Sequence, residues 1–129
     1  MKKLTTVLLL IAVFSLSAAA AHAGDPRNQP PVANDDTVIV RYEPPYVDIR
    51  VLENDYDPEG APLTVVGVPS MVGGKAVIVK GQVVRVYLPP PMSAPDYVPP
   101  IYLLAEGTYL VSDGANVSMA EWRVFLSPQ

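Results

Sequence analysis

The sequence predicts an all-β protein, a β-sandwich of seven short strands. Three observations support this fold class. Apolar and polar residues alternate in short runs, which is the period of a half-buried strand. Turn-forming residues divide these runs at regular intervals, and no window outside the N-terminal segment has a convincing helical period. Seven such runs at this spacing are typical of two antiparallel sheets packed face to face.

Residues 1–23 are predicted to be a signal peptide. The segment begins with the basic Met1-Lys2-Lys3, continues through a mostly apolar stretch from Leu4 to Ala20, and ends with Ala21-His22-Ala23. This order matches a Sec-type signal cleaved after Ala23. An uncleaved N-terminal anchor is the alternative, although the segment is short for a spanning helix. We therefore expect a secreted or periplasmic protein, or one at the cell surface.

Cleavage would leave 106 of the 129 residues, enough for one domain with a modest core. His22, Lys2 and Lys3 would be lost, so 13 acidic residues would face 7 basic ones, a net charge of −6. That charge disfavours nucleic acid and anionic membranes and favours divalent cations. With neither Cys nor His, the mature chain has no disulfide, no typical zinc site and no Ser-His or Cys-His catalytic pair. We expect no enzyme, and a monomer or weak oligomer.

The chain after the signal peptide divides into two parts. Residues 24–33 hold three prolines and read as an extended, Pro-rich leader. Residues 34–129 form the predicted sandwich domain, with strands expected at Thr37–Arg41, Tyr46–Leu52, Leu63–Val68, Lys75–Lys80, Val83–Leu88, Gly107–Ser112 and Val117–Leu126.

The last predicted strand assigns its side chains to two faces. Ala120, Trp122, Val124 and Leu126 point one way, and the residues between them point the other. The only tryptophan is therefore expected to anchor the core rather than to bind a ligand.

Segment 89–100 contains six prolines and is predicted to be a loop or a protected edge, since proline cannot donate to a sheet ladder. Tyr97 lies within this segment and Tyr102 just after it, and both are candidate contacts for a protein or glycan partner. Packing of these rings against the prolines is the other interpretation.

The stretch from Asn54 to Gly60 reads Asn-Asp-Tyr-Asp-Pro-Glu-Gly, with three carboxylates and an amide in seven residues. Carboxylates this close repel one another unless a cation or solvent intervenes, and Ca²⁺ uses such oxygen-rich loops. The spacing matches the first half of an EF-type loop, but its twelfth position is Val66, so an EF-hand is excluded. The other interpretation is that these residues only form turns.

Several of these segments together resemble a known family. Pro30 to Thr37 (PPVANDDT), Val51 to Gly60 (VLENDYDPEG) and Leu63-Thr64-Val65 are similar to the opening of a bacterial cadherin-like or Ig-like domain of the VCBS type. Val86 to Pro89 and Tyr109 to Gly114 are similar to later landmarks of that family. The resemblance implies a Greek-key Ig/cadherin-like sandwich with a role in extracellular architecture, often with bound calcium. Two features are expected to differ from the family's pattern: Asp96 to Pro100 replaces the usual approach to the penultimate strand, and a single domain is expected behind the signal peptide instead of a repeat array.

In that topology three distant loops meet at one pole of the sandwich. They would gather a candidate Ca²⁺ site of weak affinity. Its expected ligands are Asp35, Asp36, Asn54, Asp55, Asp57, Glu59 and Asp113.

These observations favour a non-enzymatic binding or structural module, acting in adhesion or extracellular assembly with a protein or glycan partner at the cell surface. A small periplasmic module that binds a soluble partner through residues 89–102 is the second hypothesis. A glycoside hydrolase acting through carboxylates is a minor third.

Overall fold

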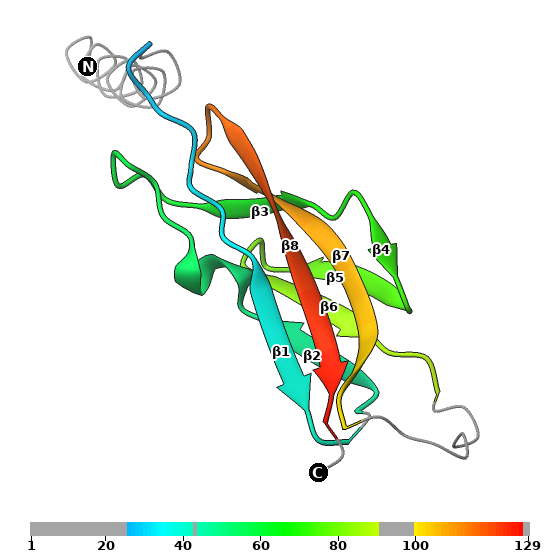
Figure 1. Ribbon diagram of the computed structural model, residues 1–129. Coiled ribbons are helices and arrows are strands. Elements are labelled where there is room, and N and C mark those ends of the chain that lie inside the picture. Colours follow the sequence, from blue (N-terminus) through cyan, green and yellow to red (C-terminus); the bar gives the residue numbers. More distant parts are fainter. Residues whose placement is uncertain (1–25, 43, 91–99, 128–129) are drawn as a thin grey trace, which may run out of the picture.

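The computed structural model describes residues 26–42, 44–90 and 100–127 (Figure 1). The predicted signal peptide, Tyr97 and most of the proline-rich segment lie outside these residues. Within them, no helix has the length and hydropathy needed to cross a membrane.

Two β-sheets pack face to face, as the sequence predicts. One sheet has the order β1-β8-β7-β3, with the short β4 also paired to β7, and the other has the order β2-β6-β5. β1 runs parallel to β8, and the other pairings are antiparallel. The strand bounds are β1 Asp36–Val40, β2 Tyr46–Ile49, β3 Thr64–Gly67, β4 Met71–Val72, β5 Lys75–Val79, β6 Val83–Tyr87, β7 Tyr102–Ser112 and β8 Val117–Leu126.

The seven predicted strands are confirmed, with two main differences in their extent and one additional short strand. The second strand was expected to reach Leu52, but β2 ends at Ile49 and a 3₁₀ turn, η1, covers Val51–Asn54. The sixth was expected to begin at Gly107, but β7 begins at Tyr102. The two-residue β4 was not predicted.

The inward alternation of β2 continues into this 3₁₀ turn, because Val51 is buried like Ile49 before it. Glu53 N–H donates to the Arg50 carbonyl and Asp55 N–H donates to the Leu52 carbonyl, which closes the turn. Asp55 then leaves the turn in an extended conformation, at the end of the sandwich.

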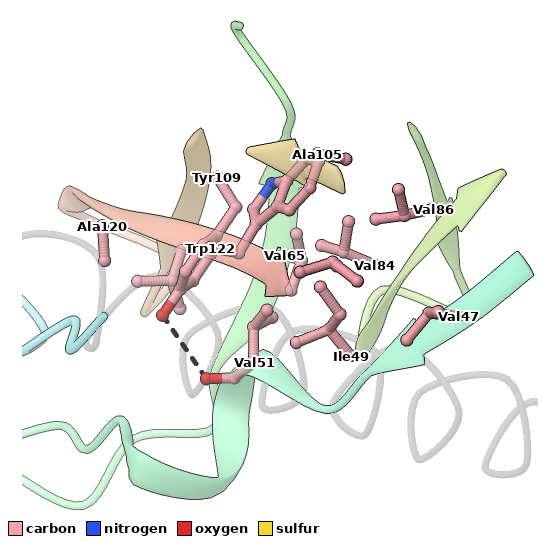
Figure 2. Packing of buried hydrophobic residues seen from close by; sticks show 12 residues of the cluster. Val47, Ile49, Val51, Val65, Val84, Val86, Ala105, Tyr109, Ala120 and Trp122 are labelled. Carbon is pink, nitrogen blue, oxygen red and sulfur yellow. Dashed lines mark hydrogen bonds between the residues drawn. The ribbon is translucent and has the colours of Figure 1, made fainter. Parts of the chain in front are cut away.

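The core is built mainly from valines around two large rings (Figure 2). Trp122 and Tyr109 are its largest fully buried side chains. The predicted faces of β8 are confirmed, since Ala120, Trp122, Val124 and Leu126 are all buried. Trp122 is thus part of the core, as expected from the alternation.

Gly107 makes room for this tryptophan. A Cβ at this position would lie 2.5 Å from Trp122 Cζ2 and 2.5 Å from the Ser70 carbonyl oxygen. Neither neighbour is free to move, because Trp122 is fully buried and Ser70 O accepts the Thr108 N–H. The glycine is therefore required by close packing rather than by its backbone angles.

We expect Gly107→Ala to lower the free energy of unfolding by about 1–3 kcal/mol, the usual cost of overpacking a core. Urea unfolding followed by Trp fluorescence measures this. Gly67→Ala is the matched control, because its Cβ would meet only the Leu110 side chain, at 3.2 Å. Equal stabilities for the two variants would contradict this account of Gly107.

Candidate functional site: the acidic pole

The extended segment before β1 crosses the end of the sandwich and brings distant loops together. Val32 forms an isolated bridge with Tyr56, with N···O distances of 2.7 and 3.1 Å. Ser118 Oγ donates to the Pro31 carbonyl at 2.6 Å. The segment predicted as a leader is thus attached both to the acidic loop and to β8.

Two groups of acidic side chains lie at this pole. The first group surrounds the hydroxyl of Tyr109, which donates to Asp55 Oδ2 at 2.7 Å. The Tyr109 hydroxyl oxygen also lies 3.0 Å from the Asn34 carbonyl oxygen. It lies 3.4 Å from the Val51 carbonyl oxygen (Figure 2). Asp55 also accepts the Asn34 N–H through Oδ1, at 2.7 Å. One buried hydroxyl therefore joins the segment just before β1, the 3₁₀ turn and the acidic loop.

Asp36, the first residue of β1, belongs to this first group. Burial raises the pKa of Asp36 to about 7, and repulsion from the Asp55 carboxylate adds to the rise. Burial also raises the pKa of Asp55 and that of the Tyr109 hydroxyl. Asp36 Oδ2 is buried and has no hydrogen-bond partner among the described residues. The first group thus holds a carboxyl that is close to half protonated at neutral pH.

The second group is formed by Asp57 and Asp113, from the loops before β3 and between β7 and β8. Both side chains are buried, with 9% and 5% of their surface exposed. The Asn116 N–H is the main cause of the lowered pKa of Asp113, and the neighbouring Asp57 side chain contributes to it. The Asn28 side-chain amide donates to Asp113 Oδ2 at 2.8 Å.

Each of these two carboxylates also holds its own turn. Asp57 Oδ2 accepts the N–H groups of Glu59 and Ala61, both at 2.9 Å. Asp113 Oδ1 accepts the N–H groups of Ala115 and Asn116, at 2.7 and 2.6 Å. The turn-forming interpretation is therefore correct for one oxygen of each residue.

Asp113 and Asp57 differ in the surroundings of their carboxyl groups. The N–H groups of Asn116 and Ala115 lower the pKa of Asp113 to about 2, so this group carries a negative charge at neutral pH. Asp57 Oδ1 is buried and lacks a hydrogen-bond partner among the described residues. A buried carboxylate oxygen without a donor is costly, and a cation or a water molecule would lower that cost.

The other expected ligands have separate roles. Asp35 Oδ1 accepts the Glu121 N–H at 2.9 Å. Asn54 Nδ2 donates to the Asp35 carbonyl at 3.0 Å, and Glu59 Oε1 accepts the Gln29 N–H at 3.0 Å. Over the described part of the chain, no group of three or more Asp, Glu, His or Cys side chains is placed to hold a metal ion. The seven expected ligands thus share one pole but are not arranged around a single point.

Two of the seven expected ligands, Asp57 and Asp113, are the residues that could hold a Ca²⁺ ion. Asp57 and Asp113 would hold the ion as a buried pair of carboxylates, and water would complete the six to eight oxygens that Ca²⁺ takes. Such a site stabilises the fold when occupied and binds weakly.

Sequence reasoning missed Asn28 and Tyr109 as parts of the pole. Tyr109 carries a usable signal, because it alternates with the inward-facing Val111 and a buried phenol needs a hydrogen-bond partner. Asn28 carries none, since its partners are 85 and 88 residues away. Of the two candidate partner contacts, Tyr102 is a half-buried residue at the start of β7, and Tyr97 lies outside the described residues.

The fold and the pole define an Ig-type β-sandwich whose polar end is organised by turns. A bacterial Ig domain family model matches residues 28–123, and the chain therefore belongs to that family. The match begins at Asn28, the first residue with an Asp113 contact. Neither the curated proteins nor the solved structures contain a significant match. Domains of this family are typically non-catalytic.

The raised pKa of Asp36 predicts that the protein loses stability as the pH rises. The unfolded chain releases this proton near pH 3.8 and the folded chain near pH 7. The free energy of unfolding should therefore fall between about pH 4 and pH 7 and level off above that range. Asp36→Asn, which keeps the shape without the charge, should match the parent at pH 4 and have a higher melting temperature at pH 8.

Glu53→Gln is the control for this prediction, because it removes a nearby charge that is exposed and does not contribute to the pKa of Asp36. If both variants show the same pH profile, burial of Asp36 is not the cause.

Proposed function

We propose that this chain is an exported, non-catalytic module of the bacterial cell surface, acting in adhesion or extracellular assembly, with a Ca²⁺ ion stabilising its acidic pole. Membership of the bacterial Ig domain family supports the non-catalytic role. The surface location rests on the same family and on the predicted signal peptide.

The observation that carries the calcium proposal is the buried Asp57 oxygen that lacks a donor, beside the ionised Asp113. The low pKa of Asp113 supports the proposal, since this carboxylate keeps its negative charge over the whole physiological range. The net negative charge of the chain raises the local cation concentration further.

The pole suits a structural ion rather than a catalytic one. Both carboxylates are held in place by backbone N–H groups of their own turns, which suits a structural role. Binding there would join the loop before β3, the loop between β7 and β8 and, through Asn28, the leader. A Ca²⁺ ion would thus hold together the end at which the chain enters the domain.

We expect Ca²⁺ to raise the melting temperature. For a dissociation constant of about 1 mM, 10 mM Ca²⁺ should add about 1.4 kcal/mol to the free energy of unfolding. Calorimetry at constant ionic strength measures the shift, and the amide NMR signals of Gly60 and Asn116 should move at the same concentrations.

Asp57→Asn should remove most of this calcium effect. Glu53→Gln is the matched control, because it removes a charge from an exposed side chain near the same pole and takes away neither buried oxygen. An unchanged melting temperature in 10 mM Ca²⁺ would end the calcium proposal, as would equal responses of the two variants.

The surface role predicts that an antibody against the folded domain labels intact native cells. The mature chain should begin at Gly24 when its N-terminus is sequenced. Labelling only after the cells are lysed, with an unprocessed N-terminus, would contradict the export proposal whatever the result with Ca²⁺.

A further inference from the structure

The solvent face of the larger sheet carries an unusual share of exposed apolar side chains. Of the twelve large apolar residues exposed in the described part of the chain, six lie on this face. They are Ile39, Val66, Val72, Leu103, Val117 and Met119. Four of the other six are tyrosines, which tolerate water at one end. A solvent face rich in aliphatic side chains marks an interaction surface.

These side chains form two rows that cross the strands. In one row, Ile39 of β1, Phe125 of β8 and Leu103 of β7 are paired across neighbouring strands. The second row pairs Met119 of β8 with Leu110 of β7. The ladder thus places one apolar row near each end of β8.

A charged band lies between the two rows. Arg123 bonds Glu121 on the same strand at 2.5 Å and lies 3.4 Å from Glu106 of β7. Read outward along β8, the order is therefore apolar at 119, acidic at 121, basic at 123 and apolar at 125. If a second copy of β8 runs antiparallel to the first, position 119 of one faces position 125 of the other, and position 121 faces position 123. Apolar side chains then meet apolar ones, and acidic side chains meet basic ones.

We propose that this face binds a second copy of the chain, with the strands antiparallel across the interface. The two-fold axis would lie in the plane of the interface and cross β8 between Glu121 and Arg123. Each Arg123 then meets Glu121 of the other copy, and the Phe125 row meets the Met119 row. This is an isologous contact, in which one surface complements itself.

The strands that flank β8 also favour the antiparallel arrangement. Glu106 and Thr108 pair with Arg123 and Glu121 of β8, so Glu106 of one copy meets the Thr108 hydroxyl of the other and not a carboxylate. A parallel arrangement would place Arg123 on Arg123 and Glu121 on Glu121. It would also bring the two acidic poles to the same end, where they would repel each other.

A hollow of about 250 Å³ lies over Gly107 and Trp122, on the same level as the proposed axis. Ser70, Thr108, Glu106 and Arg123 contribute polar atoms to its rim. Two such hollows would face each other and leave room for bridging water, as interfaces commonly do. With charges and water at its centre, the contact should be weak and reversible.

Sedimentation equilibrium of the full chain between about 10 μM and about 1 mM tests the proposal, since weak contacts fall in this range. We expect a reversible monomer–dimer equilibrium. Arg123→Glu and Glu121→Arg should each weaken dimerisation by about tenfold or more, because each puts like charges across the axis.

An equimolar mixture of these two variants should restore dimerisation, because each unlike pair is then re-formed between the copies. A purely local effect of either substitution cannot produce that recovery. Met119→Lys should also weaken the dimer, while Tyr42→Lys, at an exposed residue outside this face, should not. Leu103→Lys, on the other apolar row, replaces Met119→Lys if the latter fails to fold.

A monomeric mass at all concentrations overturns the proposal. So does a dimer that the mixture fails to restore, and so does a monomer that instead captures a different protein through this face. None of these outcomes depends on Ca²⁺, so they leave the calcium proposal to its own test.

Discussion

The organisation of the acidic pole depends on the buried hydroxyl of Tyr109. A phenol in a core must find a hydrogen-bond partner, and this one donates to the Asp55 carboxylate and lies near carbonyls of Asn34, just before β1, and of the 3₁₀ turn. These three segments are separated in sequence from Tyr109 by 54 to 75 residues. The contact therefore fixes how the chain enters the first sheet and leaves the second. The raised pKa of Asp36 is a consequence, because the same packing removes water from a second carboxyl beside Asp55.

The strand pattern could be predicted because alternation is a local property. Trp122 is a clear example, since its neighbours two residues away on either side are also buried. The start of β7 could not be predicted in this way. The ladder shifts register between Leu103 and Ala105, and this bulge interrupts the alternation where the strand begins. The end of β2 was missed for a different reason, because Val51 is apolar and buried like Ile49 before it, so the alternation continues into the 3₁₀ turn.

The pole was only partly predictable because a carboxylate has two oxygens. The local sequence around Asp57 and Asp113 predicts turns, and the structure has those turns, each using one oxygen. The fate of the second oxygen depends on residues that are distant in the sequence, such as Asn28 for Asp113. At both positions one oxygen holds the turn. The second oxygen of Asp113 accepts the Asn28 amide, and the second oxygen of Asp57 has no hydrogen-bond partner among the described residues.

The two proposed surfaces lie on different parts of the molecule, and their positions are compatible. The leader enters at the acidic pole, and β8 ends at the opposite end of the sandwich (Figure 1). In an antiparallel pair the acidic poles would therefore point away from each other. Each pole would stay open to solvent and cations, and the negative charge would be spread over the length of the pair. A parallel pair would have to bind ions at the pole before it could form, since the acidic ends would meet there. The antiparallel contact removes that requirement, so ion binding and pairing are expected to be independent of each other.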